Sequence, residues 1–177
     1  MSGHNKWTKI KHKKGAEDAK KSKLFSMLAK QISVHMKASG GDSDAPNVRA
    51  IIAKARAANM PNENIERALS RARDTGLSSF EELVFELYAP CGAAVIARAV
   101  TDNCNRTVAE IKHLLSKHAT ALAENGSALW AFVKEGGNYH ATNQLPLSEH
   151  EAEKLRALIN VLEEHDDIEA VYTNGAL

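Results

Sequence analysis

Hydrophobic residues near the start of the chain recur at intervals of three and four positions. Leu24, Leu28 and Ile32 would therefore share one side of a helix, which we expect to span residues 16–38. The lysines of this segment fall mostly on its other faces, so the predicted helix is amphipathic. Segment 40–46 (GGDSDAP) combines glycines, aspartates and a proline, and this composition indicates that the helix ends there.

Two shorter helices follow with the same spacing. The first is marked by Val48 and Ile51 and ends near Pro61, and the second spans roughly 62–73. Residues 1–15 show no apolar periodicity, so we expect an extended or disordered arm there. About the first 75 residues are therefore predicted to be helix and loop.

The hydrophobic period becomes strand-like in the second part of the chain. Runs of β-branched and aromatic residues predict strands, and two Ser/Thr-x-x-Glu capping boxes predict helix starts. The predicted elements are strands at 83–88 and 93–100, a helix opening at Thr107, strands at 127–133 and within 139–145 joined by a glycine turn, a helix opening at Ser148, and a strand at 170–173.

This order predicts the fold class. Without the strand at 83–88, the elements read β-α-β-β-α-β, which is the order of a ferredoxin-like domain. The strand at 83–88 would then be an addition to that domain. We therefore predict an α+β protein with a basic all-helical domain at 1–78 and a ferredoxin-like α/β domain at 79–177.

The two predicted domains carry opposite charge. Lysine and arginine outnumber aspartate and glutamate by 16 to 7 in residues 1–79, whereas the ratio is 7 to 15 in residues 80–177. The first 40 residues contain ten lysines and only two acidic residues. Ammonium groups at this density repel one another unless a polyanion neutralises them, and nucleic acid is the commonest such partner. The alternative is a solvated basic tail with no defined partner.

An aromatic residue lies inside this basic segment. Trp7 offers a ring on which an unpaired base could stack, and this combination favours binding over a solvated tail. Flexible, aromatic-containing arms suit RNA with accessible bases. No recognition-helix pattern is evident, which weighs against sequence-specific readout of duplex DNA.

A second candidate site lies in the segment 101–107 (TDNCNRT), between a predicted strand and a predicted helix. Free backbone N–H groups at a helix N-terminus favour an anion. The alternative, which is at least as well supported, is that these residues only form a turn and a cap. The candidate anion-binding residues are Asn103, Asn105, Arg106 and Thr107.

Trp130 and Phe132 alternate with apolar neighbours in the predicted strand at 127–133. We expect both side chains to belong to the core rather than to a base-stacking platform.

No motif in the chain indicates catalysis. His113 and His118 are five positions apart and point away from each other on a helix, and Cys91 and Cys104 lack C-x-x-C spacing. No phosphate loop or nucleophile motif is present. We therefore expect a protein that is not an enzyme and that has no metal site and no cofactor.

The composition also indicates the cellular compartment of the protein. Two cysteines give no disulfide framework, and no apolar run reaches the length of a membrane-spanning helix. The basic N-terminus lacks the apolar core of a secretory signal. We expect a cytoplasmic protein without a membrane partner. The sequence leaves the oligomeric state open, with a monomer favoured.

Five segments resemble blocks of the YebC/PmpR family in the same order. This family includes probable transcriptional regulators and a mitochondrial translational activator. The matching segments are 2–25 (SGHNKWTKIKHKKGAEDAKKSKLF), 59–69 (NMPNENIERAL), 101–118 (TDNCNRTVAEIKHLLSKH), 126–132 (GSALWAF) and 158–175 (LINVLEEHDDIEAVYTNG).

The resemblance implies a helical N-terminal domain, further α/β domains and no catalytic activity. It also implies binding to DNA, or to RNA and the ribosome. Carried over by position, the nucleic-acid surface would consist of Lys6, Trp7, Lys9, Lys11, His12, Lys13, Lys14, Lys20, Lys21 and Lys23.

The chain departs from the family pattern in three places. A short turn at 134–138 stands where members usually carry another α/β domain. Segment 89–92 (APCG) replaces a glycine-rich motif, and Cys104 occupies a position that is usually basic, which weakens the anion site.

From these observations we expect a non-catalytic nucleic-acid-binding regulator of gene expression. It would act as a ribosome- or RNA-associated translation factor or as a DNA-binding transcriptional regulator. The alternative is a protein-interaction module whose acidic α/β domain docks a partner, while the basic arm only steers association.

Overall fold

The computed structural model describes residues 4–74 and 80–177, with side chains in the first helix described for Asp18 and from Lys20 onward. The chain divides into two compact units, residues 1–79 and 80–177, and each is considered by itself. Within the described residues, no helix has both the length and the apolar character needed to cross a membrane.

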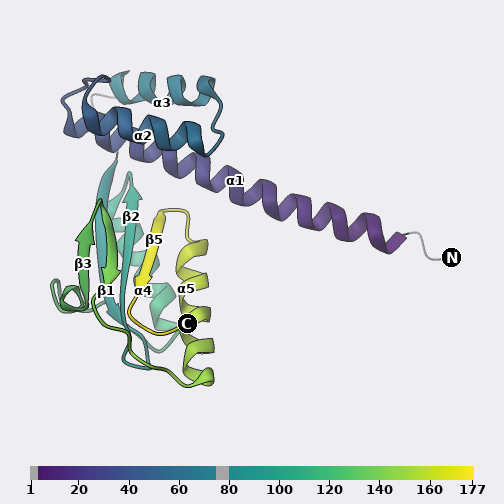
Figure 1. Ribbon diagram of the computed structural model, residues 1–177, viewed down its shortest axis with the longest axis vertical. Helices are drawn as coiled ribbons and strands as arrows, with labels where there is room; N and C mark the ends of the chain where they lie inside the picture. Colours follow the sequence, from purple (N-terminus) through teal and green to yellow (C-terminus); the bar gives the residue numbers. More distant parts are fainter. Residues whose placement is uncertain (1–3, 75–79) are drawn as a thin grey trace. The chain divides into compact units, whose positions relative to one another are not determined.

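Three helices form the first unit: α1 (His4–Ala38), α2 (Pro46–Ala57) and α3 (Asn62–Asp74). They pack around one apolar cluster. From α1 it contains Leu28, Ile32 and Met36, and α2 and α3 contribute Val48, Ile51, Ala55, Ile65, Ala68, Leu69 and Ala72. The predicted spacing is confirmed for Leu28 and Ile32 and for α2 and α3, whereas Leu24, predicted on the same face, is 45% exposed and lies outside the cluster. Figure 1 shows α2 and α3 beside only the C-terminal part of α1.

The expected N-terminal arm is helical instead. α1 begins at His4 and contains 35 residues, which corresponds to about 52 Å of helix. No proline interrupts this segment, and the single Gly15 weakens a helix by only about 1 kcal/mol. The prediction of an extended arm over 1–15 was therefore wrong from His4 onward, because the lack of an apolar stripe was read as a lack of helix.

The second unit is built on a three-stranded antiparallel sheet in the order β1-β2-β5. Its strands are β1 (Glu81–Tyr88), β2 (Ala94–Thr101) and β5 (Ile168–Thr173), and its helices are α4 (Cys104–Ser116) and α5 (Glu149–Glu164). Alternate residues of β2 face opposite sides of the sheet. Val95 and Ala97 join the main core, which includes Leu115 and Leu155 from the helices.

The other face of β2 contacts a separate β-hairpin. Ala94 and Ile96 pack with Phe132 and Tyr139 from strands β3 (Phe132–Glu135) and β4 (Asn138–Ala141). These two strands form their own two-stranded sheet. The sheet of the second unit is thus covered by helices on one face and by the hairpin on the other.

The α+β fold class, with a helical region followed by an α/β region, is confirmed. The chain order β2-α4-β3-β4-α5-β5 is that of a ferredoxin-like domain, and β1 is the added strand. The pairing differs, because β1 and β5 flank β2 while β3 and β4 pair only with each other. The strands therefore divide between two sheets.

The predicted strand at 127–133 is shorter than expected. Residues Leu129–Ala131 form a 3-10 helix, and β3 starts only at Phe132. The buried carboxylate of Glu86 accepts hydrogen bonds from the backbone N–H groups of Gly126, Ala128 and Leu129. Those N–H groups are consequently not available to pair with a strand.

Candidate nucleic-acid interface

The residues predicted to bind nucleic acid all belong to α1. Seven of them, from Lys6 to Lys14, lie where the side chains fall outside the described residues. Lys20 and Lys21 are exposed, and Lys23 is half-buried. The Lys21 Nζ atom lies 5.6 Å from the centroid of the Phe25 ring, a cation–π distance. Binding of nucleic acid by these residues stays a prediction.

The continuous helix α1 orders the lysine positions along its length. Because an α-helix has 3.6 residues per turn, residues three, four and seven positions apart share a side. This spacing groups one set of backbone positions, turned by roughly 110° about the helix axis from the side of the buried Leu28, Ile32 and Met36. The set is Lys6, Lys9, Lys13 and Lys20. An extended arm would not align these positions.

Helices α2 and α3 add exposed basic residues that the sequence reasoning missed. On α2, Arg49 and Arg56 are seven positions apart, and on α3, Arg67 and Arg71 are four positions apart, so each pair shares one side of its helix. Arg67 lies 3.4 Å from Glu63 in an exposed ion pair, which contributes little to stability. The four- and seven-residue spacing of these arginines in the sequence could have predicted that each pair shares one side of its helix.

The segment 101–107 forms the turn between β2 and α4. The Asn103 side chain caps the helix by accepting from the Arg106 backbone N–H at 3.1 Å. The helix thus begins at Cys104, and the prediction that Thr107 opens it with a capping box was wrong. Thr107 is instead buried, and its hydroxyl donates to Asp167 Oδ2 at 2.7 Å.

Carboxylates already surround the guanidinium group that the anion site would use. Arg106 Nη2 lies 2.9 Å from Asp167 Oδ2 and 3.0 Å from Asp102 Oδ1. The hydrogen bond to Asp167, followed by its charge, raises the pKa of Arg106 above its ordinary value. An external anion would have to displace these groups, and Asn105, though exposed, adds only an amide. Anion binding here stays a prediction.

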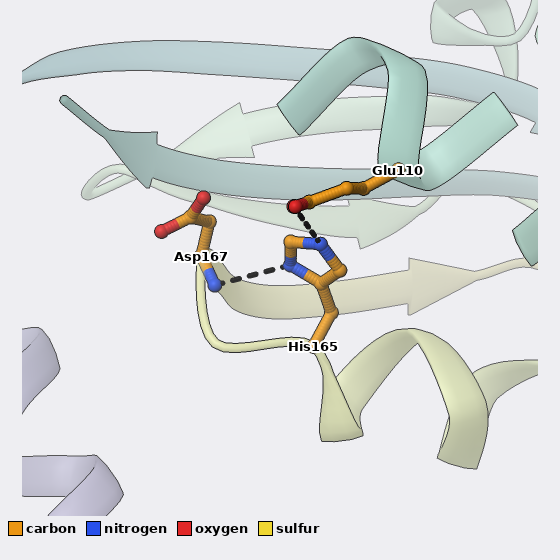
Figure 2. Close-up of side chains that lie close together, drawn as sticks. All are labelled: Glu110, His165 and Asp167. Atoms are coloured by element: carbon orange, nitrogen blue, oxygen red, sulfur yellow. Dashed lines mark hydrogen bonds and ion pairs between the residues drawn. The ribbon is translucent and has the colours of Figure 1, made fainter. Parts of the chain in front are cut away.

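A second polar group lies beside this turn, at the end of α5. His165 Nε2 is 3.0 Å from Glu110 Oε2, and the Asp167 backbone N–H donates to His165 Nδ1 at 3.1 Å. Figure 2 shows the imidazole ring between the two acidic residues. Because Nδ1 accepts a hydrogen bond, the ring proton is on Nε2 and points to Glu110.

This arrangement disfavours a metal ion. Ligand atoms of Glu110, His165 and Asp167 lie within 4.8 Å of one another, a spacing that could hold a cation. However, metal binding through Nε2 would move the ring proton to Nδ1, where it would face the Asp167 N–H. Asp167 Oδ2 also accepts from Thr107 and Arg106. The three residues are therefore better explained as a hydrogen-bonded link between two turns.

Sequence reasoning did not bring these residues together. Glu110 belongs to α4, whereas His165 and Asp167 follow α5, more than 50 positions later. Glu110 lies in the motif at 101–118, and His165 and Asp167 lie in the motif at 158–175. The residue spacing within either motif does not predict that the two motifs contact each other. Only the pairing of β2 with β5 places them side by side.

Trp130 does not occupy the predicted position in the core. Its side chain is 62% exposed, whereas Phe132 is 9% exposed and packs with Tyr139, as expected. The 3-10 helix breaks the strand alternation on which the prediction for Trp130 was based.

Two family models match the chain. The model described as the TACO1/YebC protein N-terminal domain matches residues 5–75, and the model described as the TACO1/YebC second and third domain matches residues 80–137. The second match ends at Gly137, within the turn between β3 and β4.

Individual proteins similar to this chain are described as probable transcriptional regulatory proteins. A "Probable transcriptional regulatory protein" of Thermosipho africanus is 49% identical over 138 residues, which is 77% of this chain and 55% of the relative. The chain thus spans about half the length of such relatives. A protein of the same description from Kosmotoga olearia is 36% identical over 236 positions, covering 98% of this chain and 94% of that protein.

A crystal structure supports the fold. A conserved hypothetical protein from Aquifex aeolicus superposes with a TM-score of 0.80 and 28% identity, over 90% of this chain and 91% of that chain. The Kosmotoga alignment covers more positions than the 177 residues of this chain, so that relative has residues without a counterpart here. This agrees with the predicted lack of an inserted domain.

Proposed function

The chain belongs to the TACO1/YebC family, and we propose that it is a non-catalytic nucleic-acid-binding regulator of gene expression. The observation that carries this proposal is the excess of basic residues in the helical unit. Residues 1–79 contain 16 lysines and arginines against 7 acidic residues. Each phosphate contact made by such a residue releases a condensed counterion, which drives binding at moderate salt.

The length of α1 supports a nucleic-acid partner further. Among the side chains of α1 that the structure describes, the buried ones lie between Leu28 and Met36, in the C-terminal part of the helix. A lysine-rich helix is weakened by repulsion between like charges at neighbouring turns. Phosphates along the lysine positions would remove that repulsion, and binding would therefore also stabilise the helix.

RNA, including ribosomal RNA, is the target that we favour. Trp7 provides an aromatic ring inside the basic segment, and rings of this kind stack on unpaired bases. Duplex DNA is the second candidate, and it is favoured by the description of the relatives as probable transcriptional regulatory proteins. The proposed contacts are the ten residues of α1 from Lys6 to Lys23 that were predicted from the sequence.

The test compares binding to ribosomes, single-stranded RNA and duplex DNA across a salt series. Six phosphate contacts would give a log–log slope of about −5 for duplex DNA and about −4 for single-stranded RNA. Tight RNA or ribosome binding that weakens with Trp7→Ala supports a translation role. A preference for one duplex sequence supports transcription. No binding near physiological salt would refute the proposal.

A protein-docking role for the acidic α/β unit is the competing candidate. Simultaneous replacement of Lys11, Lys13 and Lys14 by glutamine separates the two roles. Nucleic-acid binding predicts a loss of affinity and a salt slope that is shallower by about 3. A docking role predicts that the biological activity is retained. Replacement of Lys112, Lys117 and Lys154, which lie on the α/β unit, is the matched control.

A further inference from the structure

Helix α2 carries basic side chains that no acidic residue neutralises within the part of the chain that the structure describes. Residues 45–62, which include the whole helix, contain Arg49, Lys54 and Arg56 and no acidic residue. All three side chains are exposed, and none has an ion pair or a hydrogen bond among the described residues. On α3, by contrast, Arg67 forms an ion pair with Glu63. The charges of α2 are therefore available to a ligand.

These basic residues lie on the two flanks of a ridge of alanines. Successive residues of an α-helix are turned by about 100°, so the positions of Arg49 and Arg56 nearly coincide around the axis, and Lys54 is turned from them by about 150°. Ala53 and Ala57 lie between the two flanks, on the side opposite the core of the helical unit, and both are exposed. We call these five residues the α2 basic face.

The shape of the α2 basic face limits the kind of ligand that fits. The small alanines allow a ligand to approach the helix backbone closely, while the longer side chains extend past the ridge on both flanks. Arg49 and Arg56 are seven positions apart, which is about 10 Å along the helix axis. A matching ligand carries negative charge along two lines, one on each side of the helix. The two phosphate strands that border a groove of a nucleic-acid duplex have this arrangement.

The alanine ridge also indicates which duplex fits. Sequence-specific reading of the DNA major groove uses polar side chains that bond to base edges, and Ala53 and Ala57 have no such groups. The minor groove of DNA is about 6 Å wide, which is too narrow for a helix about 10 Å across. Double-stranded RNA has a wide, shallow minor groove and is recognised by its shape, through phosphates and 2′-hydroxyl groups. A ridge of methyl groups suits that surface.

We propose that the α2 basic face binds the minor groove of double-stranded RNA. Arg49 and Arg56 would contact the phosphates of one strand, and Lys54 would contact those of the other. This inference rests on the proposed binding of nucleic acid by the helical unit, and it identifies a double-stranded part of the target. It requires no residue of the α/β unit.

The first test removes the charges of the α2 basic face. Binding of the full chain is measured by anisotropy for an RNA duplex of about 16 base pairs, a DNA duplex of the same sequence and one RNA strand alone. Simultaneous replacement of Arg49, Lys54 and Arg56 by glutamine should make the log–log salt slope for the RNA duplex shallower by about 3, because three phosphate contacts are lost. Affinity for the single strand should be retained, because it has no groove.

The matched control removes the same amount of charge from another helix of the helical unit. Simultaneous replacement of Arg67, Arg71 and Arg73 on α3 by glutamine should leave the salt slope for the RNA duplex unchanged. Far-UV circular dichroism should show the helix content of the wild type in both variants, because all the replaced residues are exposed.

A second test changes the shape of the α2 basic face without changing its charge. Ala53→Leu adds bulk to the ridge, and leucine is nearly as good a helix former as alanine. It should weaken binding of the RNA duplex by about tenfold, because the helix can no longer approach the groove closely, and it should not affect the single strand. Ser70→Leu, at an exposed position of α3, is the control and should have no effect. A role limited to charge attraction would not respond to Ala53→Leu.

The outcomes separate this site from the general function. If the wild-type chain bound RNA in a salt-dependent way but neither the triple variant of α2 nor Ala53→Leu weakened binding of the RNA duplex, the site on α2 alone would be overturned, and an acidic protein would become its expected partner. Equal losses for the RNA and DNA duplexes would also overturn the proposal, because it requires the groove shape of RNA. If the wild-type chain bound no nucleic acid, both the proposed function and this site would be refuted.

Discussion

The two units of this protein are held together by different interactions. Among the described residues of the helical unit, the buried side chains are almost all aliphatic, and the one buried polar residue, Gln31, has an Oε1 atom without a hydrogen-bond partner. In the α/β unit, buried Glu86, Thr107 and Asp167 each form several hydrogen bonds. Apolar packing thus determines the first unit, and long-range polar contacts join the turns of the second.

The two units also differ in the sign of their charge and in whether charged side chains are buried. The helical unit is basic, and its charged side chains that the structure describes are exposed or half-buried, whereas the α/β unit is acidic and buries part of its charge. The Arg98–Glu169 pair, with a 2.7 Å separation and side chains 11% and 6% exposed, is one example. The basic character of the first unit is what supports the proposal that this unit binds a polyanion.

The largest expected effect concerns apolar packing in the helical unit. Ile32→Ala should lower the free energy of unfolding of this unit by about 4 kcal/mol, because Ile32 is 0% exposed and its loss leaves a cavity. Denaturant unfolding followed by far-UV circular dichroism measures it. Leu24→Ala, on the same helix but 45% exposed, should change stability by less than about 1 kcal/mol. Equal effects of the two variants would contradict the assigned core.

A somewhat smaller effect is expected from the buried carboxylate of the α/β unit. Glu86→Ala leaves three backbone N–H groups without their acceptor and should destabilise this unit by about 3 kcal/mol. Trp130 fluorescence in the Trp7→Phe background should report it. Glu82→Ala, an exposed residue four positions earlier on β1, is the control. If Glu86→Ala destabilised the helical unit equally, the two units would not be energetically distinct.

The hydrogen bonds of Thr107 in the β2–α4 turn to Asp167 in the turn after α5 should contribute less to the stability of the α/β unit. Thr107→Val removes the hydroxyl that bonds Asp167 at 2.7 Å and Thr101 at 2.8 Å, and should destabilise the α/β unit by about 2 kcal/mol. A double-mutant cycle with Asp167→Asn should show coupling, because both residues share one network. Additive effects would mean that the link is not cooperative.

The smallest effect concerns pH and the start of α5. Ser148 and Glu151 form a capping box, and the Ser148 side chain followed by its backbone N–H lowers the pKa of Glu151 from 4.5. A carboxylate with a lowered pKa stabilises the fold above its unfolded pKa, and this contribution disappears as the pH falls through the folded value. Ser148→Ala should therefore cost about 1 kcal/mol at pH 7 and less at pH 3.

The matched control for this pH effect is Glu153→Gln, an exposed residue of the same helix without a capping bond. Its stability difference from the wild type should not follow the same pH dependence. A Ser148→Ala effect that stayed constant from pH 7 to pH 3 would show that the carboxylate does not contribute through its charge.

Local patterns in the sequence were sufficient for the elements that depend on neighbouring residues. The spacing of Leu28 and Ile32 predicted the packed part of α1, the Ser148 capping box predicted α5, and the glycine pair at 136–137 predicted the hairpin turn. Helix periodicity, caps and tight turns involve residues within a few positions of one another, so their signals lie in short segments.

Only the tertiary structure decided the rest. Glu86 lies about 40 positions before the N–H groups that it binds, and these bonds turned the expected strand at Trp130 into a 3-10 helix with an exposed indole. Asp167 reached Thr107 and Arg106 because β2 pairs with β5. The pattern of the sequence thus determined the packed helices, the cap of α5 and the basic character of α1. Contacts between distant segments determined the strand pairing and the position of Trp130, because no local spacing encodes them.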